Sequence, residues 1–378
     1  MPQVTSAGGL SAPDAGRPPE PLLADRKVEP DVPGEGVHEP GSKDVRETGG
    51  YALQAVVRTG EGPGPPKAAE VNASAIDSVR RKTEARMAIE AGSARARFVF
   101  SGGFVVPPGT ELRARIDRYG HLLLWPGEAT YRIAEAGSAR ALLGERRLDV
   151  APQSLADVQA SEETGRRLNM RTRRVDLSTR AAKAVFELAT LREAGEGGTL
   201  VCRLLLELMS ASPASSVCAV DEVPVHAELR WATGGTLTFD VTSIARRLEF
   251  PSGSLNVPPA SLAFVTSPPP FSPADLLVSR AELAAFRTAP VDVPTPASRD
   301  AQPPPPDSGL LLINASDELR VVWLDGVEVA WIAPGNRLAL PMLLRGRYAL
   351  QWRTFLGDGL DAPDTVIVPG TSEVEAGR

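Results

Sequence analysis

Short runs of alternating apolar and polar positions cover much of the chain from residue 95 onward, and this period of two predicts strands. The clearest case is residues 223–241, where two such runs flank a Gly-Gly turn and predict a β-hairpin. A second hairpin is predicted over residues 112–125, and residues 154–169 are polar and predict a loop with a helical turn. Further short strands are predicted at 98–100, 130–133, 147–150 and 185–188.

Helices are predicted at three places. A capping-box pattern predicts a helix over residues 74–90. Thr199 is the expected cap of an apolar helix over residues 200–210, whose leucines indicate burial of a wide face. Ser272 is the expected N-cap of a third helix, which must end before Pro290.

Composition divides the chain into four parts. Residues 1–72 are rich in proline, glycine and acidic residues, bury too little apolar surface to offset their ordering entropy, and predict a disordered tail. Two proline runs mark residues 267–308 as a linker that holds one helix. Between and after them we expect an α+β module at 73–266 and a small all-β sandwich at 309–370. The predicted fold class is therefore mainly β with a few helices and a disordered N-terminal tail.

The last module carries a resemblance to a known family. Its strands are expected at 310–313, 320–324, 327–332, 337–340, 348–352 and 366–368. Asp325-Gly326 predicts a tight type I′ turn. The runs 321–329, 333–335 and 343–352 resemble PEGA-type modules, which are small β-sandwich repeats of bacterial envelope and surface proteins, although the Pro-Glu-Gly-Ala tetrapeptide itself is absent. The resemblance implies a structural or binding module and no catalytic residue, and the middle module resembles no characterised family.

Charge and hydropathy exclude several classes of function. The formal net charge is −6, and an acidic chain is not suited to coat nucleic acid or an anionic membrane. No apolar run approaches the roughly 18 residues that span a bilayer, so no transmembrane segment is predicted. Residues 1–10 lack the features of a signal peptide, which favours the cytoplasm. The preference for arginine over lysine, with abundant alanine, glycine and proline, is typical of GC-rich bacterial genomes.

Two cysteines, Cys202 and Cys218, leave three alternatives open. They can form a disulfide, remain as two buried thiols, or provide a nucleophilic Cys202 with His226 as its base. A disulfide would indicate an oxidising compartment, the cell envelope or periplasm, despite the missing signal peptide.

Other candidate chemistry is sparse. The Gly-Glu-Gly-Gly segment at 195–198 resembles a phosphate-binding loop but lacks the required later glycine and a nearby lysine, so a flexible connection is expected. His121 and His226 lie on predicted strands outside any zinc motif. Three aspartates that recur every third residue predict a solvated turn rather than a calcium site: Asp358, Asp361 and Asp364. No cofactor and no metal site is predicted.

Two groups of residues are candidate binding surfaces. The basic group can contact an acidic partner, a phosphate-rich polymer or nucleic acid, although nucleic acid is not expected because no aromatic residue is interleaved; it comprises Arg166, Arg167, Arg171, Arg173 and Arg174. The aromatic group should lie mostly in the core, and any member left exposed would contact protein or carbohydrate; it comprises Trp323, Trp331, Tyr348 and Trp352.

Nothing in the sequence identifies an enzyme. The predicted function is that of a non-enzymatic bacterial envelope or surface protein with a structural role, or a role in binding an unknown protein or polysaccharide. The alternative is an enzyme of unrecognised type with a site between helix 199–210 and the middle sheet. A deep pocket there with a perturbed carboxylate or thiol would favour the enzyme, whereas an open polar surface would favour the binding module.

Overall fold

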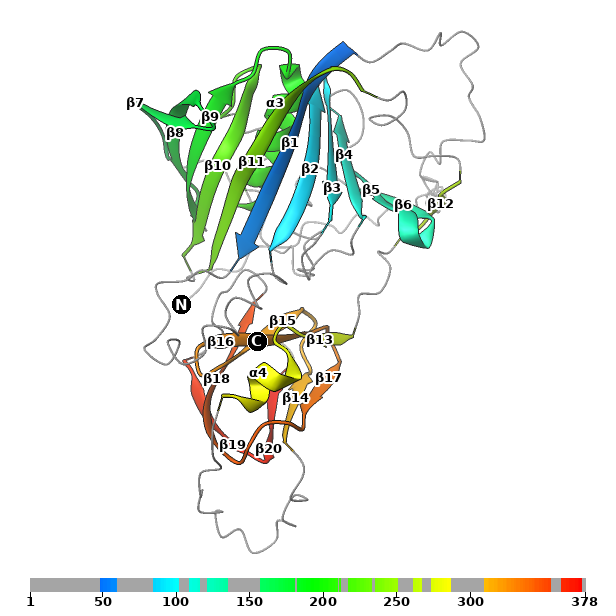
Figure 1. The fold of residues 1–378 in the computed structure, drawn as a ribbon, viewed down its shortest axis with the longest axis vertical. Coiled ribbons are helices and arrows are strands. Elements are labelled where there is room, and N and C mark those ends of the chain that lie inside the picture. The colour runs from blue at the N-terminus through cyan, green and yellow to red at the C-terminus, as the bar shows by residue number, and fades with distance from the viewer. Residues whose placement is uncertain are drawn as a thin grey trace, which may run out of the picture. The chain divides into compact units, whose positions relative to one another are not determined.

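Strands dominate the protein, which confirms the mainly β fold class (Figure 1). The computed structural model describes residues 48–59, 84–101, 109–115, 121–134, 157–180, 182–209, 211, 217–232, 235–250, 261–266, 273–286, 309–354 and 362–375. Residues 1–47, the strand predicted at 147–150, and Asp358 and Asp361 lie outside this part of the chain.

The largest sheet has twelve strands, and β1 lies in its middle. Every neighbouring pair is antiparallel except β12 with β6. In spatial order the strands are β12 (Ala263–Phe264), β6 (Thr130–Ala134), β5 (His121–Trp125), β4 (Glu111–Arg115), β3 (Arg95–Phe100), β2 (Ala85–Gly92), β1 (Thr48–Thr59), β11 (Thr236–Glu249), β10 (Glu222–Trp231), β9 (Ala182–Thr190), β8 (Met170–Ser178) and β7 (Asp157–Arg167). A 3₁₀ turn, η2 (Pro126–Glu128), joins β5 to β6.

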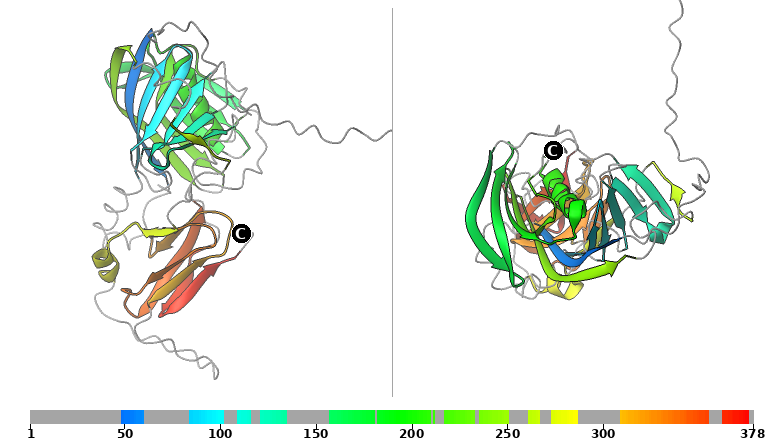
Figure 2. Two further views of the ribbon diagram at one scale, coloured as in Figure 1. Left: turned by 90° about the vertical axis from the view of Figure 1, so that its right-hand side faces the viewer. Right: turned by 90° about the horizontal axis from the view of Figure 1, so that it is seen from above.

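One face of this sheet curves around the helix α3 (Gly195–Leu208), as the view from above in Figure 2 shows. Ten of the fourteen residues of α3 are buried, which is the pattern of a helix enclosed on nearly all sides. In β10, Ala227 and Leu229 are buried while Glu228 and Arg230 are not. We call the face that covers α3 the inner face and the opposite, more polar face the outer face.

Close backbone packing positions the first turn of α3. A Cβ on Gly197 would overlap the carbonyl oxygen of Arg95, and the Gly197 N–H donates to the Ser93 carbonyl at 3.0 Å. The Asp221 carboxylate accepts from the N–H groups of Glu193 (3.1 Å) and Gly195 (2.7 Å). The expected flexible connection is therefore wrong: residues 195–198 form the first turn of α3, where the Gly195 N–H donates to the Asp221 carboxylate and the N–H groups of Gly197 and Gly198 donate to backbone carbonyls.

The predicted disordered tail is wrong over Thr48–Thr59, which forms strand β1 between β11 and β2. Leu53 and Ala55 are buried on the inner face and Gln54 between them is exposed, so the period of two is present. The glycine- and proline-rich sequence around this strand obscures its period. A bulge in the β1–β11 pair leaves Thr242 of β11 without a register partner in β1, while the pairing of β1 with β2 is continuous.

Three further local predictions are wrong. The helix over 74–90 is replaced at its C-terminal end by β2, in which Met87 and Ile89 point inward. The loop predicted over 154–169 is wrong over Asp157–Arg167, which forms the edge strand β7, and the polar sequence of this strand hides its period. Thr199 does not cap α3, because the helix begins at Gly195. The apolar helix itself and the hairpin of β10 and β11 are confirmed.

The C-terminal residues form two smaller sheets. The first contains β13 (Ala274–Leu276), β16 (Val327–Ile332), β15 (Arg320–Leu324), β18 (Gly346–Thr354) and β19 (Asp364–Val368), in that order. The second contains β17 (Arg337–Leu340), β14 (Leu310–Asn314) and β20 (Gly370–Val374). At the β15–β16 turn, φ is 48° at Asp325 and 81° at Gly326, as the predicted type I′ turn requires. The resemblance to PEGA-type modules stays a prediction.

The helix predicted from Ser272 is wrong over its first residues. Ala274–Leu276 forms β13 and pairs with β16, so part of the expected linker belongs to the five-stranded sheet. The helix here is α4 (Arg280–Ala284), which begins after Ser279. Ser279 and Glu282 form a complete capping box, a stronger start signal than Ser272 with its aspartate three residues later.

Candidate binding surface

Three arginines of the predicted basic group have carboxylate partners. The guanidinium of Arg173 donates to both oxygens of Glu222, at 3.0 and 2.6 Å, and that of Arg174 donates to both oxygens of Asp176, at 3.0 and 2.9 Å. Burial opposes ionisation of Glu222, but hydrogen bonds from Arg173 lower its pKa overall. The hydrogen bonds from Arg174 lower the pKa of Asp176. These pairs neutralise part of the predicted basic patch.

Arg167, the third of them, belongs to a charged network on the outer face. Its guanidinium contacts Glu187 at 2.7 Å and Asp240 at 3.3 Å. Asp240 also accepts from His226 Nδ1 at 2.6 Å and lies 3.5 Å from the guanidinium of Arg58. The network therefore joins β7, β9, β10, β11 and β1. His226 lies on a strand as predicted, but the other members of this network come from four other strands, and no sequence pattern links them to it.

The remaining two arginines face one another. Arg166 and Arg171 are directly opposite in the β7–β8 register, and both are exposed. Neither forms an ion pair with any residue whose side chain the structure describes. Between them, Leu168 and Asn169 form the turn, and both have positive φ. The structure thus separates the predicted group into three arginines paired within the protein and two that point to solvent.

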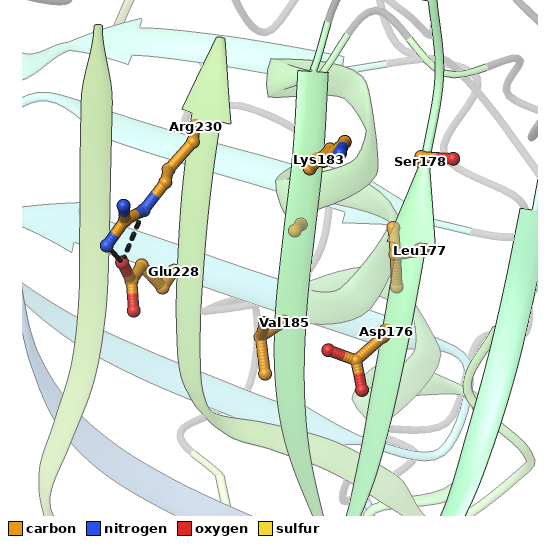
Figure 3. A pocket seen from close by; sticks show the side chains of 8 residues that line it. Asp176, Leu177, Ser178, Lys183, Val185, Glu228 and Arg230 are labelled. Carbon is orange, nitrogen blue, oxygen red and sulfur yellow. Dashed lines mark hydrogen bonds and ion pairs between the residues drawn. The ribbon is translucent and has the colours of Figure 1, made fainter. Parts of the chain in front are cut away.

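A depression of about 420 Å³ lies on the outer face of β8, β9 and β10 (Figure 3). Charges of both signs line it, and Glu228 and Arg230 form an ion pair on its floor. The other lining residues are Asp176, Leu177, Ser178, Lys183, Ala184 and Val185. It is open to solvent and contains no aromatic side chain.

The inner face holds the residues of the alternative enzyme site. Cys202 and Cys218 are joined by a disulfide, the first of the three alternatives, so Cys202 is not a free nucleophile. His226 lies on the outer face with Asp240, away from the cysteines. On the inner face, His121 Nε2 and Glu207 Oε2 are 2.6 Å apart, and both side chains are buried.

The aromatic group is mostly in the core. Trp331, Tyr348 and Trp352 are buried, and Trp323 is half-buried. The guanidinium of Arg353 lies 3.9 Å from the ring centre of Trp323, so one ring face is already covered by a cation–π contact. Burial of Glu328, which is opposite Trp323 in the register, raises its pKa to about 8, and the charge of Arg353 opposes this shift. The Arg353 contact leaves at most one face of the Trp323 ring for a partner.

Within the described residues, no group of three or more His, Cys, Asp or Glu side chains could hold a metal ion. None of the helices in these ranges is long and apolar enough to cross a membrane.

No protein-family model matches the chain, and no curated protein matches it. Among solved structures, the match to MucB in complex with MucA(peri) covers 85% of this chain and 88% of that chain, at 12% identity and a TM-score of 0.29. The match to PNGF-II covers 55% of this chain but 29% of that chain, at 8% identity and a TM-score of 0.29. A putative outer membrane lipoprotein-sorting protein domain from Vibrio parahaemolyticus matches 55% of this chain and 88% of its own length, at 6% identity and a TM-score of 0.27. These matches assign no function to this chain.

Proposed function

We propose that this chain is a non-enzymatic protein of the bacterial cell envelope that binds another protein through the outer face of its twelve-stranded sheet. The observation that carries the proposal is the depression over β8, β9 and β10, which is open and lined by charges of both signs. It lies on the face of the sheet opposite α3. An open surface lined by charged side chains is the kind of site that was expected of a binding module, and it supports binding.

The inner face supports the same assignment. Helix α3 packs against it over β2, β3, β4 and β10, and the Cys202–Cys218 disulfide joins the helix to the segment before β10. A stable disulfide is typical of proteins in oxidising compartments, which supports an envelope or periplasmic location.

The partner could be a protein or a polysaccharide, and the residues that line the depression favour a protein. The basic residues Lys183 and Arg230 and the acidic residues Asp176 and Glu228 all line the depression, so a partner would meet both signs of charge within one small area. Polysaccharide sites commonly rely on aromatic stacking, and the lining has no aromatic ring. Electrostatic complementarity of mixed sign is a feature of protein interfaces, where it sets partner choice.

The proposal is tested by site-specific photo-crosslinking in cells that express the gene natively. A photoreactive residue replaces Lys183, which is exposed in the depression, and a matched probe replaces Arg337, which is exposed on β17. We expect a discrete protein adduct in the envelope fraction from position 183, none from position 337, and several-fold less adduct when Glu228→Arg is added. Loss of the adduct in all variants, or two alkylatable thiols in protein isolated from cells, would contradict the proposal.

A further inference from the structure

The tip of the β7–β8 hairpin combines features that are unfavourable in the isolated protein. We propose that Arg166, Leu168 and Arg171 form a docking point for an acidic, partly apolar segment of the partner protein. This proposal rests on the proposed function and names the chemistry of the partner.

The first unfavourable feature is a like-charge pair. Arg166 and Arg171 are direct cross-strand partners, and like charges in that position repel one another. The neighbouring arginines show that the chain supplies carboxylates where it neutralises such charges: Arg167 contacts Glu187 and Asp240, and Arg173 contacts Glu222. Among the side chains that the structure describes, none provides a carboxylate for Arg166 or Arg171.

The second and third features concern Leu168. Its φ is 49°, in the left-handed region where a Cβ is unfavourable, whereas the adjacent Asn169 at 63° is a residue type that tolerates this conformation. A two-residue turn of this kind favours Asn, Asp or Gly at its first position. The Leu168 side chain is also 42% exposed, so it gains little from burial. Strain and exposure together at one residue are a reason to look for a function.

The base of the hairpin is fixed, so these groups are presented in a defined position. Arg167, directly before the turn, contacts Glu187 and Asp240 on the outer face, and Arg173, further along β8, contacts Glu222 at the start of β10, so both ends of this part of the hairpin are held. A binding group that is already ordered loses less entropy when a partner arrives.

The chemistry of the tip selects the partner. Two guanidinium groups across a strand pair bind carboxylates or phosphates with charge-assisted hydrogen bonds. A phosphorylated polysaccharide would pair with the arginines but leave Leu168 in water. A peptide with acidic and aliphatic residues would pair with both arginines and also bury Leu168, so the geometry favours a protein segment.

The test measures the binding of fluorescein-labelled peptides to the full chain by fluorescence anisotropy at low ionic strength. The probe is a peptide of alternating Glu and Leu, compared with peptides of alternating Glu and Ser and of alternating Lys and Leu. We expect binding of the Glu/Leu peptide, weaker binding of the Glu/Ser peptide and none of the Lys/Leu peptide. The double variant Arg166→Glu with Arg171→Glu should weaken binding of the Glu/Leu peptide by at least about tenfold, and the matched control Arg337→Glu should change it less than about twofold.

Thermal melts of the same variants separate docking from a structural role. The double reversal keeps a like-charge pair, so its Tm should match that of the wild type. Leu168→Gly removes the unfavourable φ and should raise the Tm by about 2 °C while it weakens peptide binding several-fold. A structural role predicts the opposite, a lower Tm.

Three results would overturn the inference. The first is a Leu168→Gly variant with a lower Tm than the wild type. The second is an Arg166→Glu, Arg171→Glu double variant that binds the Glu/Leu peptide as tightly as the wild type does. The third is phosphorylated dextran that binds more tightly than the peptide and equally well to the Leu168→Gly variant. If the crosslinks at position 183 persist while the peptide fails to bind, this inference alone is wrong and the proposed function stands.

Discussion

Two histidine–carboxylate pairs occupy opposite faces of the same sheet at the same separation. On the inner face, His121 of β5 lies 2.6 Å from Glu207 of α3, and on the outer face, His226 of β10 lies 2.6 Å from Asp240 of β11. The side chains of the inner pair are 3% and 1% exposed, and those of the outer pair are 14% and 25% exposed. The two nitrogen–oxygen distances are therefore equal, although one pair is buried and the other is partly exposed to solvent.

The environments determine what each pair contributes. In the inner pair, His121 Nδ1 and Glu207 Oε1 have no hydrogen-bond partner among the described residues, so each residue depends on the other for its polar contact. In the outer pair, Asp240 also contacts Arg58 and Arg167, and solvent reaches the site. A buried pair with few other contacts is costly to break, whereas a partly solvated network loses little when one member is removed.

The largest predicted effect tests the inner pair. Glu207→Leu leaves His121 buried without a polar partner, and we expect a loss of about 3–5 kcal/mol in the free energy of unfolding. The double variant His121→Leu with Glu207→Leu removes both polar groups and should recover most of that loss. Urea denaturation of both variants measures the difference. Equal losses in the single and double variants would show that packing, not the pairing, determines the stability here.

A second prediction concerns the packing of the first turn of α3 against the inner face. Gly197→Ala places a methyl group against the backbone of Gly92 and Arg95, so the helix must shift, at a cost of about 1–3 kcal/mol. The matched control is Gly127→Ala in the η2 turn, where a Cβ meets nothing within 4 Å and where we expect a change below about 0.5 kcal/mol. Similar effects of the two substitutions, measured by thermal melts, would refute the close packing at Gly197.

The C-terminal strands could be predicted from sequence because local signals determine them. The Asp325-Gly326 turn sets the register of β15 and β16, and both strands have the predicted bounds. The final strand β20 was missed because Gly370–Val374 is mostly polar and pairs in parallel with β14, which is distant in sequence. Short-range alternation carries no information about such a pairing.

In the large sheet, local signals were weaker and tertiary packing decided the outcome. Strand β1 lies in the middle of the sheet although the residues on either side of it in the sequence have a composition typical of disorder.

The candidate site could also be predicted only in part from the sequence. The arginine group was visible in the sequence, but the partners of Arg167 and Arg173 are Glu187, Glu222 and Asp240, which come from three other strands; only Arg174 has a partner, Asp176, that is near in sequence. The His121–Glu207 pair joins residues 86 positions apart, and no sequence pattern links them.

The smallest predicted effect completes the comparison on the outer face. Asp240→Asn keeps the shape of the side chain and a hydrogen-bond acceptor for His226, but it removes the charge that Arg58 and Arg167 face. Because Glu84 still pairs with Arg58 and Glu187 with Arg167, we expect a loss of only about 0.5–1 kcal/mol in the free energy of unfolding. The loss should shrink in high salt, since partly exposed charges are screened. Urea denaturation at low and high salt measures both quantities. A loss as large as that of Glu207→Leu and unchanged by salt would mean that the charge of Asp240 is shielded from solvent as well as a buried charge is. The outer pair would then contribute as much to stability as the inner pair, contrary to the comparison.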